Sequence, residues 1–221
     1  MREIVLMADP RVGRIPVTDS GERLVDLGAA GFPIDERLAD PQGASRQLRE
    51  GAAERLARAQ MLLPAGLRLL VVEGYRPPEL QRKLFEGYRE ELAQLNPDYS
   101  AEQLRTAASR YVSPPELAPH SAGAAIDLTL CDAEGRELDM GTPMNATPEE
   151  SDGRCYTDAA SLAPRVVENR AVLVEVMHSA GFVNYPTEWW HFSYGDRYWA
   201  LMSQRAEALY GPIEYHGSLD E

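Results

Sequence analysis

Cysteine is scarce in this sequence, with Cys131 and Cys155 the only two among 221 residues. Two cysteines cannot build the disulfide framework of a small secreted domain, and their spacing is not that of a CxxC pair, so we expect reduced thiols. No apolar run approaches the ~18 residues of a membrane-spanning helix. The apolar run near the N-terminus is also too short for the core of a signal peptide. We therefore predict a cytoplasmic protein that is not bound to a membrane.

Basic residues are also in the minority. The chain has 22 Lys+Arg against 35 Asp+Glu, a formal net charge of −13, and Lys83 is its one lysine. Nucleic acids and anionic membrane surfaces require a basic face, so neither is expected as a partner. The preference for arginine is interpreted as drift in base composition. Hydrophobic residues make up 44% and charged residues 26%, which is ordinary for a globular protein and too apolar for a disordered one.

Apolar spacing along the chain predicts an α+β fold rather than a regular βαβ alternation. Helices are predicted where apolar residues recur every three or four positions, over 45–63, 77–96, 100–111, 162–180 and 198–210. Strands are predicted where short runs are rich in branched or aromatic residues, at 67–75, 124–130 and 188–194. We expect one domain over 1–221, a small antiparallel sheet flanked by helices, with 1–43 as an irregular segment packed on the body.

Local signals fix the start of two of these helices. Pro77 and Pro78 suit the first turn of a helix, where a missing N–H costs little. Ser100 followed by Gln103 is the pattern of a capping box. Within the helix over 77–96, the apolar stripe consists of Leu80, Leu84, Tyr88, Leu92 and Leu95.

Four polar residues lie inside or beside apolar runs. Asp127 interrupts the predicted strand 124–130, and His120 precedes it by seven positions. Glu188 and His191 flank Trp189-Trp190, although residues three apart on an ideal strand point to opposite faces, so a bulge or a strand that begins after Glu188 is needed. Each has a simpler interpretation when taken alone: Asp127 could face solvent, and His191 could be a hydrogen-bonded histidine of the core.

These residues fit one metal when they are considered together. His120, Asp127 and His191 supply two imidazoles and a carboxylate, the number of protein ligands in a catalytic zinc site with an open fourth position. Zinc binding explains a carboxylate in an apolar run, and Glu188 would then lie close to the attacking water. The sequence has no HExxH motif, so this is not a thermolysin-type helix. The other two histidines, His178 near a predicted helix end and His216 in a polar tail, are left outside the site.

Arg76 directly follows the predicted strand 67–75 and precedes the helix that begins with two prolines. A guanidinium held on such a turn can stabilise an oxyanion or bind a carboxylate through two parallel hydrogen bonds. The alternative is a surface arginine paired with a helix acid such as Glu79.

Four segments, EGYRP, HSAGAAIDLTL, DMGTP and EWWHF, resemble in order and separation the zinc D-alanyl-D-alanine dipeptidases of peptidase family M15. The resemblance runs from about 48 to 199. Three places differ: Val25-Asp26-Leu27-Gly28-Ala29 lacks the Arg-Tyr pair usual there, Asn145 stands where the family more often has Asp, and Pro119 precedes His120 in place of a small polar residue. None of these differences changes the expected metal ligands.

The resemblance implies an enzyme with one Zn²⁺ per chain that hydrolyses D-Ala-D-Ala-type dipeptides. His120, Asp127 and His191 would bind the zinc, Glu188 would be the general base and acid, and Arg76 would stabilise the tetrahedral intermediate. A small dipeptide is the expected partner, and the sequence does not predict an oligomeric state. Two alternatives remain: a DD- or LD-carboxypeptidase acting on peptidoglycan stem peptides, and a non-catalytic zinc- or peptide-binding domain.

Overall fold

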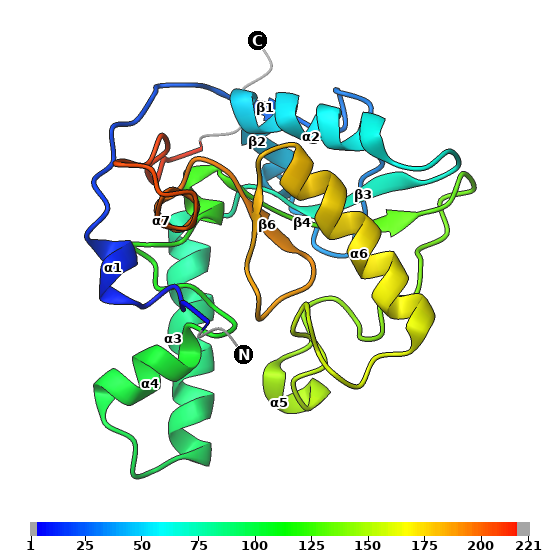
Figure 1. The fold of residues 1–221 in the computed structure, drawn as a ribbon. Helices are drawn as coiled ribbons and strands as arrows, with labels where there is room; N and C mark the ends of the chain where they lie inside the picture. Colours follow the sequence, from blue (N-terminus) through cyan, green and yellow to red (C-terminus); the bar gives the residue numbers. More distant parts are fainter. Residues whose placement is uncertain (1–3, 216–221) are drawn as a thin grey trace.

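Helices and two small antiparallel sheets make up the fold (Figure 1), seen in a computed structural model that describes residues 4–215. The strands are β1 (Leu24–Asp26), β2 (Gln47–Arg49), β3 (Arg68–Glu73), β4 (Ala125–Cys131), β5 (Val183–Asn184) and β6 (His191–Ser193). The α-helices are α1 (Pro10–Gly13), α2 (Glu50–Leu62), α3 (Pro78–Leu95), α4 (Ala101–Ala108), α5 (Pro148–Ser151), α6 (Pro164–Ser179) and α7 (Arg197–Met202). Two 3₁₀ turns, η1 (Ala44–Arg46) and η2 (His120–Ala122), precede β2 and β4. The predicted α+β class is confirmed.

The larger sheet has the strand order β3-β4-β6-β5, and all of its pairs are antiparallel. Its register places Asp127 of β4 between Glu73 of β3 and His191 of β6. A β-bulge between Val71 and Glu73 shifts the register at the end of β3. Three polar residues, remote in sequence, therefore lie in one row across the sheet.

One face of this sheet carries the apolar core. Ile126, Leu128 and Leu130 alternate along β4 and are fully buried in the main hydrophobic cluster. The same cluster includes Leu56 of α2 and Leu173 of α6, and these two helices lie side by side over the sheet in Figure 1. Asp127 has the opposite orientation on β4, so its carboxylate points to the other face, where α3 lies.

Several boundaries differ from the sequence prediction. The helix expected from Ser45 begins only at Glu50, because Gln47–Arg49 pair with β1 as a strand. The strand expected over 188–194 is limited to His191–Ser193, and the closing helix ends at Met202. Residues 4–43, predicted to be irregular, contribute α1 and β1. The capping box of Ser100 and Gln103 is confirmed.

Of the apolar stripe predicted on α3, Leu92 is buried, but Leu80, Leu84 and Leu95 are exposed. The residues that α3 buries are Gln81, Phe85 and Leu92, whereas Leu80 and Leu84 are 43% and 41% exposed. Phe85 and Leu92 pack on Ala108 of α4 in a separate small cluster, because α4 and not the main core covers this helix. Leu80 and Leu84 consequently face the sheet-side cavity described below.

Both cysteines are free and buried, in agreement with the prediction of reduced thiols. His178 lies in the last turn of α6, and His216 falls outside the described residues. Across 4–215, none of the helices has the length and apolarity needed to span a membrane.

Candidate metal centre and active-site cavity

The three predicted ligands converge on one point although they come from separate elements. His120 begins η2, Asp127 lies mid-way along β4, and His191 opens β6. All three are almost fully buried, at 4%, 3% and 4% exposure. Asp127 Oδ1 lies 2.9 Å from His191 Nδ1 and 3.3 Å from His120 Nε2, and the two imidazole nitrogens are 3.2 Å apart.

These separations fit a tetrahedral metal. Zinc lies ~2.0–2.1 Å from nitrogen and oxygen ligands, and a tetrahedron of that size has edges of ~3.3–3.4 Å. The three ligand atoms form a triangle with sides close to this value. Two imidazoles with one carboxylate are donors that zinc accepts, so the residues present fit the group that the sequence predicts.

A hydrogen bond to the backbone fixes the orientation of the His120 ring. Its Nδ1 lies 2.6 Å from the carbonyl oxygen of Gly74, so Nδ1 carries the proton and Nε2 is left to face the metal position. Gly74 itself is clamped between segments, since a Cβ there would lie only 2.3 Å from the carbonyl oxygen of Gln47. The end of β3 therefore sets the tautomer of the first ligand.

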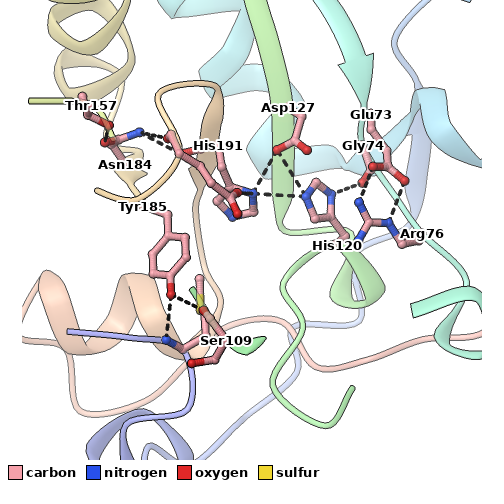
Figure 2. Close-up of polar contacts among 12 residues, drawn as sticks. Glu73, Gly74, Arg76, Ser109, His120, Asp127, Thr157, Asn184, Tyr185 and His191 are labelled. Carbon is pink, nitrogen blue, oxygen red and sulfur yellow. Dashed lines mark hydrogen bonds and ion pairs between the residues drawn. The ribbon is translucent and has the colours of Figure 1, made fainter. Parts of the chain in front are cut away.

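A side-chain amide holds the turn that carries Glu188 and His191 (Figure 2). Asn184 Nδ2 donates to the carbonyl oxygens of Glu188 and His191, at 3.0 and 2.9 Å. Thr157 Oγ1 donates in turn to Asn184 Oδ1. Glu188 thus lies in a turn before β6, which is the arrangement that places residues three apart on the same side.

Glu188 is a buried carboxylate beside the ligand triangle. Its Oε2 lies 3.7 Å from His191 Nδ1, and its Oε1 has no hydrogen-bond partner among residues 4–215. Burial, followed by the nearby Asp127 carboxylate, raises the pKa of Glu188 well above its usual value. A carboxyl group with a raised pKa and an oxygen that has no hydrogen-bond partner among the described residues is suited to accept and return a proton.

Arg76 is paired with Glu73 and not with Glu79. Its Nε donates to Glu73 Oε1 at 2.7 Å, and its Nη2 donates to Glu73 Oε2. Its Nη1 donates to Gln81 Oε1 at 2.8 Å, and Gln81 is fixed by donating to the carbonyl oxygen of Ser113. Burial alone lowers the pKa of Arg76, but the Glu73 carboxylate outweighs it and the net shift is upward, so the guanidinium stays charged.

The charges of the ligands are coupled. Burial alone raises the pKa of Asp127, but His120 and then His191 outweigh it and hold that pKa far below its usual range. Burial likewise lowers the pKa of His120, yet Asp127 raises it more. A proton on His120 therefore competes with a metal ion, so metal affinity falls as the pH falls.

A cavity of about 560 Å³ joins these groups. Its lining includes all five predicted site residues, together with Glu73, Gln81, Tyr111, Asn145, Tyr185 and one face of α3. The pairing of Glu73 with Arg76 is not among the sequence predictions, although the spacing of three positions between them is a signal for it. No sequence signal pointed to Tyr185. Its ring centroid lies 6.0 Å from that of His191, and its hydroxyl accepts a hydrogen bond from Met7 N and donates one to the carbonyl oxygen of Ser109 (Figure 2).

The fold and the site define a metallopeptidase-like centre, and comparison with known proteins gives its class. A profile of the D-ala-D-ala dipeptidase family, peptidase M15, matches residues 34–208, so the chain belongs to this family of hydrolases. A D-alanyl-D-alanine dipeptidase of Synechocystis is 29% identical over 93% of this chain and 95% of its own length. One from Escherichia coli is 34% identical over 58% of this chain and 55% of its own. The predicted family is confirmed.

A solved structure, a vancomycin-resistance D,D-pentapeptidase VanY mutant in complex with Zn(II), gives a TM-score of 0.43 at 17% identity. That alignment covers 80% of this chain and 90% of the other.

Proposed function

We propose that this chain hydrolyses D-alanyl-D-alanine and closely related D,D-dipeptides with one zinc ion held by His120, Asp127 and His191. The observation that carries the proposal is the ligand triangle of 2.9–3.3 Å beside the buried carboxylate of Glu188. Membership of the D-ala-D-ala dipeptidase family supports the substrate class.

Glu188 moves the protons of the reaction. Zinc, when bound, supplies a nucleophilic water near neutral pH and polarises the substrate carbonyl. Glu188 Oε1, which has no other partner among the described residues, takes a proton from the attacking water and returns it to the nitrogen of the leaving amino acid. The surrounding burial keeps competing water away from this carboxylate.

Arg76 stabilises the negative charge that develops on the carbonyl oxygen. Three of its five N–H groups are engaged by Glu73 and Gln81, which leaves one on each terminal nitrogen. These hydrogen bonds hold the fork of the guanidinium in one orientation, and Arg76 lines the same cavity as Glu188. A donor set that does not need to reorganise as charge appears is the most effective kind.

The non-catalytic alternative is disfavoured by Glu188. A zinc- or peptide-binding domain has no need of a buried carboxylate with an unpaired oxygen, because such a group costs free energy that only chemistry would compensate. The carboxypeptidase alternative would use the same groups on a longer substrate, and we include stem peptides in the test for that reason.

The test is metal content together with a substrate panel. Purified protein is expected to hold about one zinc per chain, and chelation should abolish hydrolysis of D-Ala-D-Ala, with activity restored by zinc. The panel compares D,D-, L,D- and L,L-dialanine with a stem pentapeptide, and D-Ala-D-Ala is expected to be the best of these. Full activity without metal, or a preference for the pentapeptide, would contradict the proposal. The cytoplasmic location, which suits a small diffusible substrate, stays a prediction that cell fractionation tests.

A further inference from the structure

The cavity continues well beyond the metal centre. Its volume of about 560 Å³ lies within the range of pockets that hold drug-sized ligands, ~300–1,000 Å³. A dipeptide of two alanines is much smaller than such a ligand. Besides the groups described above, its lining includes residues of α3 from Leu80 to Glu91.

One face of α3 forms the wall of this extension. Leu80, Leu84, Gly87 and Glu91 line the cavity at helical spacings of four, three and four, so they form one stripe. Leu80 and Leu84 belong to the predicted apolar stripe of α3, and both are exposed. Apolar side chains of this size beside an active site provide a surface that a ligand can remove from water.

The dimensions exceed what two residues need. From Leu80 to Glu91 the helix rises by ~16 Å, at ~1.5 Å per residue. Two residues of extended peptide span at most ~7 Å. The stripe therefore has room beside the dipeptide backbone for a large side chain.

The opposite side of the groove is rigidly held. Tyr88 of α3 packs edge-to-face on Tyr111, with ring centroids 5.2 Å apart. Tyr111 donates to the carbonyl oxygen of Asn145, and Tyr88 donates to Glu149 Oε2. These bonds tie Tyr88 of α3 to α5 and Tyr111 to the loop before α5, so both sides of the groove are held in place.

We propose that the groove between α3 and Tyr111 is a side-chain subsite, and that the preferred substrates are D,D-dipeptides with one large apolar or aromatic residue. This inference rests on the proposed function and narrows its substrate class. Burial of such a side chain against Leu80 and Leu84 would favour these dipeptides over D-Ala-D-Ala by about tenfold or more.

The first experiment measures binding and turnover separately. Zinc-loaded Glu188→Gln protein is titrated with D-Ala-D-Ala, D-Ala-D-Phe and D-Phe-D-Ala, and the wild-type enzyme is assayed for kcat/KM on the same three. At least one phenylalanyl dipeptide is expected to bind about tenfold tighter and to react with a correspondingly higher kcat/KM. If both phenylalanyl dipeptides bind more weakly than D-Ala-D-Ala, the subsite is overturned.

Gly87 allows the groove to be blocked without a loss of fold. A Cβ at Gly87 meets nothing within 4 Å, and glycine inside a helix is destabilising, so Gly87→Phe should fold at least as well as the wild type. The new ring would occupy the groove and lower the ratio of phenylalanyl-dipeptide to D-Ala-D-Ala kcat/KM by about tenfold. Leu95→Phe is the matched control, because Leu95 is 70% exposed on the same helix and outside the cavity lining.

The outcomes separate the two proposals. An unchanged ratio in Gly87→Phe, or an equal loss on all three dipeptides, overturns the subsite even if the wild type hydrolyses D-Ala-D-Ala. If the zinc-loaded wild type hydrolyses no dipeptide, the proposed function fails, and the titrations of Glu188→Gln and of its Gly87→Phe double variant still decide whether the groove binds the aromatic side chain.

Discussion

The two faces of the four-stranded sheet are built from the same strands, but one carries the apolar core and the other the polar candidate site. On the face covered by α2 and α6, Ile126, Leu128 and Leu130 are wholly buried among apolar neighbours. On the other face, Asp127 is just as buried but surrounded by His120, His191, Glu188 and Arg76. One residue step along β4 separates the two environments.

The difference shows how the fold offsets the free-energy cost of burying the charged groups of the site. Burying several ionisable groups is unfavourable unless they are paired, and the described site leaves Glu188 Oε1 and His191 Nε2 unsatisfied. The apolar face provides the compensating stability and fixes the strand positions. Substitutions on the two faces should therefore have separable effects. Those on the polar face should lower activity and leave stability unchanged, and those on the apolar face should lower stability and leave activity unchanged.

The largest expected effect is on the polar face. Glu188→Gln keeps the shape of the side chain but cannot accept a proton, so turnover should fall by about 10²–10⁴-fold. Zinc content, measured by atomic absorption, should remain that of the wild type. A variant with near-normal kcat would show that another group is the base.

The second effect belongs to the apolar face. Leu173→Ala creates a cavity in the main core and should lower the free energy of unfolding by about 2–5 kcal/mol, measured by urea titration. The kcat of the folded fraction should not change. Val167→Ala is the control on the same helix, since Val167 is 50% exposed and its loss should cost less than about 0.5 kcal/mol. A large loss of kcat in Leu173→Ala would show that the two faces are not separable.

The third effect tests the pair that orients the guanidinium. Glu73→Gln should lower kcat/KM by about 10–100-fold, as is typical when a supporting partner is removed. Its effect should not add to that of Arg76→Lys, because both act through the same fork. Glu79→Gln is the control and should have no effect. Additive losses would mean that Glu73 contacts the substrate by itself.

The smallest effect concerns a buried carboxylate outside the site. Asp196 caps α7 through Trp199 N, and burial raises its pKa to about 6. A raised carboxyl pKa means that the native state binds more protons than the unfolded state, so stability falls as the pH rises towards that value. Unfolding free energy should drop by about 1 kcal/mol between roughly pH 5 and 6. Asp196→Asn should remove this slope, and an unchanged slope would assign it to other groups.

Much of the site could be predicted from the sequence, because its chemistry stands out locally. Asp127 interrupts an apolar run, and Glu188 and His191 interrupt an aromatic one. Burying ionisable groups costs free energy, so such positions indicate a function. The strands and helices with strong periodicity, β3, β4, α3 and α6, were located correctly for the same local reason.

The remainder depended on contacts between distant segments. Gln47–Arg49 have helical spacing with α2, yet pairing with β1 makes them a strand. The apolar face of α3 could not be chosen from periodicity, because α4 covers Phe85 and Leu92 while the cavity takes Leu80 and Leu84. The contribution of Tyr185 likewise required the fold, since its partners Met7 and Ser109 are far from it in sequence.

Gly74 has a meaning for how sequences of this kind are compared. Its carbonyl oxygen selects the proton position on His120, and its missing side chain lets β3 approach Gln47. A relative could keep every ligand and the base and still lose metal affinity through any other residue at this position. Intact ligands are thus a necessary but insufficient diagnostic of an active enzyme, and Gly74, four residues before α3 begins at Pro78, should be compared together with the three ligands and Glu188.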